Sequence, residues 1–225
     1  MGLTAAITII AFWAVHLITF LEYGEVDFTS PIMYLRIIVQ AYLFTGLFIT
    51  AHDSMHGSVH KKNKVNKTVG YIASFLFAGM SYNRLKKNHY LHHKYPGTEK
   101  DPDYSSTRSF IPWFAKFMYR YTTISQIVAM AVLFNVLLIW YNEPKLLIFW
   151  ILPALLSTLQ LFYFGTYLPH RKPHTHDMGR HRARTQSKNH LWAMLSCYFF
   201  GYHTEHHESP GTPWWQLYTK KSIKQ

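Results

Sequence analysis

Histidines spaced three or four residues apart form the clearest chemical pattern in this chain of 225 residues. They occur in three groups, HDSMH, HYLHH and HTEHH, whose members are His52, His56, His89, His92, His93, His203, His206 and His207. Residues at this spacing share one side of a helix, so each group can present its imidazoles together. Neutral imidazole binds Zn, Fe, Cu and Ni. Eight such ligands exceed what one ion needs, and the pattern therefore predicts a site for two metal ions.

Further candidates stand near these groups. His170 follows a long apolar segment directly, and we predict that it is a ninth metal ligand. A metal-bound histidine usually donates its other ring N–H to an acceptor. Four carboxylates are candidates for this supporting or catalytic role: Asp53, Asp101, Asp103 and Glu205. For Asp101 and Asp103, which flank Pro102, a solvated turn is an equally good interpretation.

The other histidines have less informative surroundings. His60 lies in a lysine-rich run, where a solvated loop is expected. Four more lie in an Arg/Lys-rich stretch and are interpreted mostly as surface residues: His174, His176, His181 and His190. His16, inside an apolar segment, suits a hydrogen-bonded core histidine, although ionisable groups within spans are functional candidates. The single cysteine, Cys197, excludes an internal disulfide and a cysteine-ligated metal site.

Long apolar segments must position these groups, and they predict an all-α integral membrane protein with one domain over residues 1–225. Four candidate transmembrane helices cover residues 3–21, 31–51, 124–141 and 145–168. The first has no charged residue and spans about 28 Å as a helix, which matches the hydrocarbon core of a bilayer. It lacks a preceding basic stretch and a cleavage site, so we expect a span rather than a signal peptide. Pro153 and Pro169 predict a bend and an end in the fourth helix.

The charge distribution orients the chain. The formal net charge is +12, and 21 of the 23 Lys/Arg residues fall in two stretches, 52–123 and 169–225, which also hold 14 of the 15 histidines. The connection 22–30 is acidic and contains no base. The positive-inside rule therefore predicts that both basic stretches form a cytoplasmic helical cap carrying the metal site. Because these charges flank spans, they favour anionic membrane lipid and an acidic protein as partners, and they do not indicate nucleic acid.

Longer strings around the histidines resemble one family. The chain resembles the bacterial CrtW-type β-carotene 4-ketolases, within the membrane fatty-acid desaturase and hydroxylase superfamily, in strings that run from about residue 49 to 217. These strings are HDSMHG at 52–57, PGT at 96–98, DPDY at 101–104, LFYFGTYLPHR at 161–171, GYHTEHH at 201–207 and PWWQL at 213–217.

The resemblance implies a specific chemistry. It implies two non-haem irons held by the eight histidines and His170, with O₂ as oxidant and electrons from an external donor such as ferredoxin. The implied substrate is a carotenoid taken from the bilayer of the bacterial inner membrane. Double hydroxylation and dehydration at C4 of its β-ionone ring would convert β-carotene to echinenone and canthaxanthin, and zeaxanthin to astaxanthin.

Two alternatives stay open at this point. A carotenoid hydroxylase or a fatty-acid desaturase would use the same histidine groups. A metal transporter or metal store is the alternative from another class, but it would place ionisable groups along the spans, where only His16 and Arg36 occur. The sequence does not assign individual histidines to individual ions.

Overall fold

Helices form the whole framework of the protein. The computed structural model describes residues 1–221, and within them the only strand-like pairing is an isolated bridge between Thr185 and Tyr202. The longer elements are α1 (Gly2–Tyr23), α2 (Pro31–Met55), α3 (Asn63–Ala78), α4 (Tyr82–Lys94), α5 (Phe110–Tyr121), α6 (Ile124–Leu137), α8 (Leu152–Phe162) and α10 (His190–Cys197). The shorter ones are α7 (Glu143–Leu146), η1 (Leu147–Ile151), η2 (Tyr163–Tyr167), α9 (Leu168–His170), η3 (His176–Met178), α11 (His203–Glu208) and η4 (Trp214–Lys220). The predicted all-α fold is confirmed for this part of the chain.

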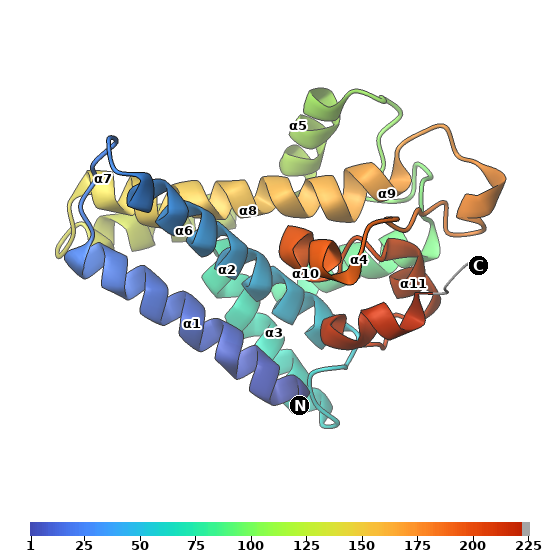
Figure 1. The fold of residues 1–225 in the computed structure, drawn as a ribbon, viewed down its shortest axis with the longest axis horizontal. Helices are drawn as coiled ribbons and strands as arrows, with labels where there is room; N and C mark the ends of the chain where they lie inside the picture. Colours follow the sequence, from blue (N-terminus) through green and yellow to red (C-terminus); the bar gives the residue numbers. More distant parts are fainter. Residues whose placement is uncertain (222–225) are drawn as a thin grey trace.

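In the described part of the chain, three helices are long and apolar enough to cross a membrane: α1, α2 and the continuous helix Glu143–His170. The outermost, α1, buries one stripe at helical spacing, made of Ala6, Ile9, Trp13, Leu17 and Leu21. The rest of its surface, including Phe12 and Ile18, stays exposed, as expected for a helix that faces lipid. Helix α2 packs against α1, α3 and α8 and so lies at the centre of the bundle (Figure 1).

A fourth crossing would need two helices together. Helix α6 has 14 residues and ends at Leu137, short of the span expected over residues 124–141. Helices α5 and α6 are together long and apolar enough to cross a membrane, but they meet at an angle of 85°. Thr122 has an extended backbone at the break, and the Thr123 hydroxyl caps α6 by accepting a bond from the Gln126 N–H at 3.1 Å. Figure 1 shows α5 standing away from the bundle, crosswise to α8.

The last span accommodates its two prolines with π-helical turns. η1 ends two residues before Pro153, and η2 ends two residues before Pro169. Proline has no N–H and its ring clashes with the carbonyl four residues back, and a wider turn relieves this misfit. The helix therefore continues through Pro169, where we expected it to end, and stops at His170. His170 is therefore the last residue of this helix.

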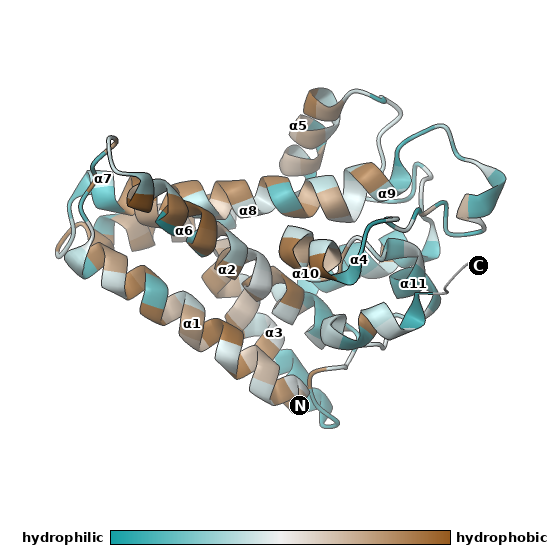
Figure 2. Cartoon of the chain, in the orientation of Figure 1, coloured by the Kyte–Doolittle hydropathy of each residue, from teal (hydrophilic) through white to brown (hydrophobic). Residues whose placement is uncertain are grey.

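The histidine-bearing elements gather at one end of the bundle. Figure 2 shows the spans as largely hydrophobic, whereas α4, α11 and the loops around them are hydrophilic. Polar residues start two of these elements, because Ser81 caps α4 and Asn189 caps α10. The core beneath them is apolar and aromatic, with Phe44, Phe149 and Leu47 fully buried. The bundle is thus a closely packed apolar support for a polar cap.

Candidate metal centre

Nine imidazoles from four separate parts of the chain converge in the polar cap. His52 lies in the last turn of α2 and His56 directly follows that helix. Helix α4 carries His89, His92 and His93, α11 carries His203, His206 and His207, and α9 ends with His170. These are the nine histidines that the sequence analysis singled out as ligand candidates, and they form two groups whose nitrogens lie within 4.8 Å of one another.

The first group contains five histidines: His52, His56, His89, His93 and His206. Their Nε2 atoms face one another. His93 Nε2 lies 3.0 Å from His89 Nε2 and 2.9 Å from His206 Nε2. His52 Nε2 lies 3.1 Å from His206 Nε2, and His56 Nε2 lies 2.6 Å from His89 Nε2.

The second group contains four histidines: His92, His170, His203 and His207. His207 Nε2 lies 3.1 Å from both His92 Nε2 and His203 Nε2. The His170 ring stands 4.8 Å from the rings of His92 and His203, measured between centroids. All four side chains are buried.

Helix geometry explains how each HxxHH string serves both groups. His89 and His93 are four residues apart and share one face of α4, and both join the first group. His92 points about 100° away from His93 because a helix turns 3.6 residues per turn. In α11 the division is reversed, since His203 and His207 join the second group and His206 joins the first.

Three observations indicate that the two groups of imidazole nitrogens fit metal ions. Nitrogens bound at right angles about 2.1 Å from one ion would be about 3.0 Å apart, close to the observed separations. His92 Nδ1 and His170 Nδ1 donate to oxygen acceptors, which leaves the Nε2 lone pairs directed into the site. His170 Nε2 is also buried without a hydrogen-bond partner. Facing lone pairs repel, and a cation between them removes the repulsion.

The electrostatics keep most of these imidazoles neutral, which is the form that binds metal. Burial lowers the pKa of His93 to about 2 and that of His56 to about 4. Burial and the neighbouring imidazoles also hold the pKa values of His89, His206 and His207 well below the usual range. His92 differs. Burial lowers its pKa, but the carboxylates of Asp101 and Asp103 outweigh burial and raise it overall.

Asp101 anchors His92. Both of its carboxylate oxygens lie 3.1 Å from His92 Nδ1, and the side chain is 1% exposed. The same carboxylate accepts the backbone N–H of Gly97 at 2.9 Å and of Asp103 at 2.8 Å. Asp101 is therefore a buried support for a histidine of the second group, and the solvated-turn interpretation is wrong for it.

Asp103 joins this support to another helix. Its Oδ2 lies 3.7 Å from His92 Nδ1, and its Oδ1 accepts a short hydrogen bond from the Tyr121 hydroxyl at the end of α5. Burial raises the pKa of the Asp103 carboxyl to about 6. The Asp-Pro-Asp turn thus lies between the metal-site histidines and the break between α5 and α6.

The other two candidate carboxylates are also buried but have different contacts. Asp53 Oδ1 lies 3.6 Å from His52 Nδ1, and its Oδ2 accepts the Trp214 backbone N–H at 3.1 Å, which ties the C-terminal segment to α2. Glu205 is buried on α11, and its Oε2 atom has no hydrogen-bond partner among the described residues. Of the four carboxylates, Asp101 makes the closest contact with a candidate ligand.

Several contacts to the histidines had no recognisable pattern in the sequence. The Arg182 carbonyl accepts His170 Nδ1–H at 2.9 Å, and the Arg182 side chain donates to the Gly97 carbonyl at 2.8 Å. Phe200 packs edge-on against His52 and His203. It follows Tyr198 and Phe199, both with positive φ, a conformation that costs energy and often marks functional sites.

The remaining histidines stand outside both groups. Within residues 1–221, none of the following joins a nitrogen cluster: His16, His60, His174, His176, His181 and His190. His16 Nδ1 lies 2.5 Å from the Gln40 side-chain oxygen inside the bundle, as expected for a hydrogen-bonded core histidine. The His181 ring lies 5.2 Å from that of His207, and His174 Nε2 lies 3.0 Å from the His170 carbonyl oxygen.

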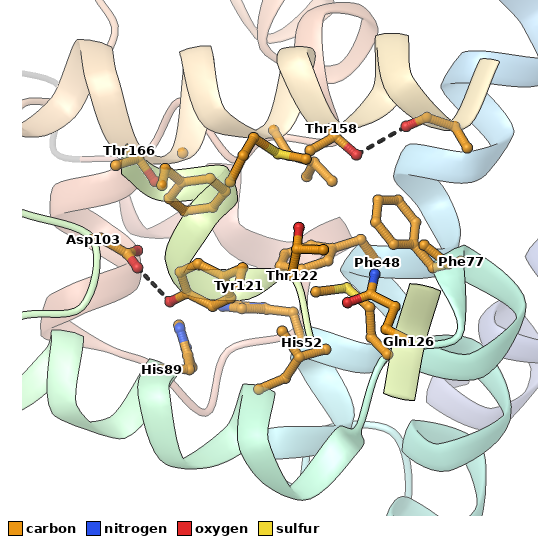
Figure 3. A pocket seen from close by; sticks show the side chains of 18 of the residues that line it. Phe48, His52, Phe77, His89, Asp103, Tyr121, Thr122, Gln126, Thr158 and Thr166 are labelled. Atoms are coloured by element: carbon orange, nitrogen blue, oxygen red, sulfur yellow. Dashed lines mark hydrogen bonds between the residues drawn. The ribbon is translucent and has the colours of Figure 1, made fainter. Parts of the chain in front are cut away.

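An apolar cavity of about 350 Å³ leads to the metal centre. His52, His89, His92 and His203 form its inner end, and both groups are therefore represented there. Its walls come from α2, α3, α5, α6 and α8 and are mainly aromatic and aliphatic, as at Phe48, Phe77 and Met130. Figure 3 shows Tyr121, Thr122 and Gln126, from the α5–α6 region, beside His52 and His89. Outward-facing Ile127 and Leu155 also line the cavity, so it reaches the side of the bundle that faces lipid.

Comparison with known families identifies this arrangement. Residues 29–222 match the fatty acid desaturase family. The chain belongs to the fatty acid desaturase family. Its apolar spans and this membership make it an integral membrane protein, and membership in a fatty acid desaturase family accords with a non-haem metal site built from histidine.

Three relatives narrow the position within the desaturase family. The chain is 38% identical over 96% of its length to zeaxanthin 4-ketolase of Chlamydomonas reinhardtii. It is 39% identical over 80% to β-carotene 4-ketolase 3 of Haematococcus lacustris, and 36% identical over 93% to the β-carotene ketolase of Paracoccus sp. strain N81106. The chain spans 52% and 59% of the two algal proteins but 87% of the Paracoccus protein. Over most of its own length the chain is thus similar to carotenoid ketolases.

Proposed function

We propose that this desaturase-family protein is a carotenoid ketolase that oxidises C4 of a β-ionone ring, with β-carotene as substrate and 3-hydroxylated rings accepted as well. The observation that carries the proposal is the apolar cavity that ends on histidines of both metal groups. Relatives named for ketone formation at C4 of β-carotene and zeaxanthin support the choice of substrate.

The cavity suits a ring at the end of a polyene. Its lining is largely hydrocarbon, so an apolar ring is favoured there over water. The opening beside Ile127 and Leu155 would admit the substrate from the bilayer, with the rest of the polyene left among the spans. Phe48, Phe77 and Phe200 would hold the ring so that C4 approaches the imidazole face.

The nine histidines would hold two iron ions, one in each group. When bound, the iron pair would supply the activation of O₂ needed to oxidise the C4–H bond. The chain's own residues do the rest. Asp101 and the Arg182 carbonyl fix the Nδ1–H tautomers of His92 and His170, and the buried phenylalanines exclude water from the reacting ring.

The chemical balance requires two successive oxidations at one carbon. In each, one oxygen atom enters a C4–H bond and the other leaves as water, with two electrons and two protons consumed. The resulting geminal diol loses water to give the ketone. C4 is allylic to the ring double bond, so its C–H bonds are weaker than those of the neighbouring CH₂ groups.

An outside protein must supply the electrons for this chemistry. We propose an acidic ferredoxin-type donor on the cytoplasmic side of a bacterial inner membrane, where the basic stretches would lie under the positive-inside rule. Anionic lipid headgroups would neutralise the basic residues nearest the bilayer. His56, His89 and His93 are partly exposed, so the first group can be approached from solvent.

The test is anaerobic loading of the purified protein with ferrous iron, followed by O₂, a reduced ferredoxin and β-carotene, with chromatography of the pigments. Echinenone and canthaxanthin are the expected products. Zeaxanthin as the sole product would instead identify a 3-hydroxylase, and a new double bond in acyl lipid would identify a desaturase. Tight iron binding without oxygen consumption, whether β-carotene or acyl lipid is present, would favour a transport or storage role.

A further inference from the structure

Three hydrogen-bonding side chains fasten α5 to the Asp-Pro-Asp turn beside His92. Arg120 donates through Nη1 to the carbonyl oxygens of Pro102 at 2.8 Å and Tyr104 at 2.9 Å, and more weakly to that of Asp101 at 3.4 Å. Trp113 Nε1 donates to the Asp103 carbonyl at 2.7 Å. These bonds, from residues near both ends of α5, hold the backbone of the turn along the helix.

Tyr121 makes the only side-chain-to-side-chain bond of this fastening among residues 1–221, because its hydroxyl donates to the Asp103 carboxylate. Asp103 faces His92 Nδ1 with its other oxygen, 3.7 Å away. Tyr121, Asp103 and His92 all line the substrate cavity. Figure 3 shows the hydrogen bond between Tyr121 and Asp103. A single chain of contacts therefore runs from a metal-site histidine through a carboxylate to the cavity wall.

Tyr121 also lies where regular helical structure is interrupted in that wall. It is the last residue of α5, and Thr122 and Thr123 form the break before α6. The two helices meet there at 85°, and no intrahelical hydrogen-bond ladder runs across a break of this kind. Thr122 and Gln126, just beyond it, line the same cavity. The position of this wall relative to His92 thus depends on side-chain bonds.

We propose that Tyr121 is a positioning residue whose hydroxyl, bonded to Asp103, keeps the cavity wall at the α5–α6 break aligned with His92. This inference rests on the proposed ketolase function. If the substrate ring shifted by one carbon, C3 would face the metal centre in place of C4, or O₂ would be reduced without oxidation of the substrate. The hydroxyl would therefore govern which carbon is oxidised and how tightly O₂ consumption is coupled to product.

The experiment compares Tyr121→Phe with Tyr119→Phe in the full-length, iron-loaded protein. Tyr119 lies two residues earlier on α5 and is 86% exposed, so its substitution removes the same kind of hydroxyl group without changing the cavity lining. Iron per chain, melting temperature, O₂ consumed and each oxidised carotenoid are measured for both variants and the parent protein.

We expect Tyr121→Phe to keep the iron content of the parent protein while ketone formed per O₂ consumed falls about tenfold and 3-hydroxylated products appear. Bonds to charged acceptors are worth about a factor of ten or more, and the lower figure applies because the Arg120 and Trp113 bonds remain. Tyr119→Phe should match the parent protein. Parent-like coupling and products in Tyr121→Phe would overturn the inference.

Two other results would overturn it as well. Loss of iron from Tyr121→Phe would assign the hydroxyl to metal retention, and failure of that variant to accumulate beside a normal Tyr119→Phe would assign it to folding. Failure of the parent protein to form any C4 ketone would refute the proposed function itself. This result is measured on the parent protein alone and does not depend on the variants. The two failures are therefore distinguishable.

Discussion

Replacing Asp101 by asparagine tests how the second histidine group is held. The carboxylate accepts from three N–H groups: His92 Nδ1, Gly97 N and Asp103 N. Asparagine keeps one acceptor oxygen and places an NH₂ group where the other oxygen stood. At least one of the three donors then faces another donor in a buried site, because Asp101 is 1% exposed.

The expected magnitude follows from these contacts. An unsatisfied buried donor costs about 1–3 kcal/mol, and loss of the acceptor behind a ligand histidine typically reduces metal affinity about 10- to 100-fold. The negative charge that raises the pKa of His92 is lost at the same time, which makes its Nε2 a weaker donor to metal. We expect the second group to lose iron first, and the first group to be affected much less.

The assay is iron titration of the detergent-purified protein against a chelator of known affinity, with Asp27→Asn as control. Asp27 lies in the exposed loop between α1 and α2, where its carboxylate accepts hydrogen bonds from Thr29. Asp101→Asn should show one weakened ion, shifted by one to two orders of magnitude, and Asp27→Asn none. Unchanged affinity for both ions in Asp101→Asn would refute the assignment of His92 and its carboxylate to a metal site.

Three further predictions concern the cavity, the ninth histidine and the metal itself. A Cβ added at Gly165 would lie 2.4 Å from the Phe200 ring, so Gly165→Ala should destabilise the protein by about 1–3 kcal/mol and slow turnover. Gly211→Ala adds its Cβ in open space and should do neither. Equal melting temperatures for the two variants would contradict this packing. His170→Ala should lose about one iron per chain and most activity, and His176→Ala, outside both groups, should retain both, as metal analysis can show. Chelation of iron should lower the melting temperature progressively with chelator concentration, since ligand bound only to the folded state stabilises it; an unchanged melting curve would argue against nine ligands that unite four parts of the chain.

The local part of the site was predictable from the sequence. Spacing of three and four residues identifies a helical face without any knowledge of the tertiary fold, so the eight histidines of the three groups stood out. His170 was recognisable because it ends an apolar segment, and helix ends deliver side chains to the membrane boundary. The long spans followed from hydropathy in the same way.

The non-local part was not predictable. His92 and His93 are neighbours in sequence but join different groups, and this division depends on how α4 meets α2 and α11. The Arg182 carbonyl that fixes His170 is a backbone atom, which any residue would supply. Nothing in local composition distinguishes Tyr121 from the exposed Tyr119, because their roles depend on how α5 packs against a turn nearly twenty residues earlier.

The path of the chain through the membrane was only partly foreseen. Hydropathy alone placed a span over residues 124–141, whereas α6 ends at Leu137 and gains the length of a crossing only with α5. Pro169 was expected to end the last helix, but the π-helical turn η2 absorbs it and carries the helix on to His170. The π-helical turn η2 lies just before His170, and residues of the α5–α6 break line the cavity, so irregular backbone occurs close to the metal centre, as is common at functional sites.

Iron X-ray absorption on the loaded protein tests most directly whether two imidazole sites lie side by side. Two iron ions per chain, each surrounded mainly by nitrogen donors with the multiple-scattering pattern of imidazole, are the predicted result. A single iron per chain, or ions bound chiefly by carboxylate oxygen, would contradict the account.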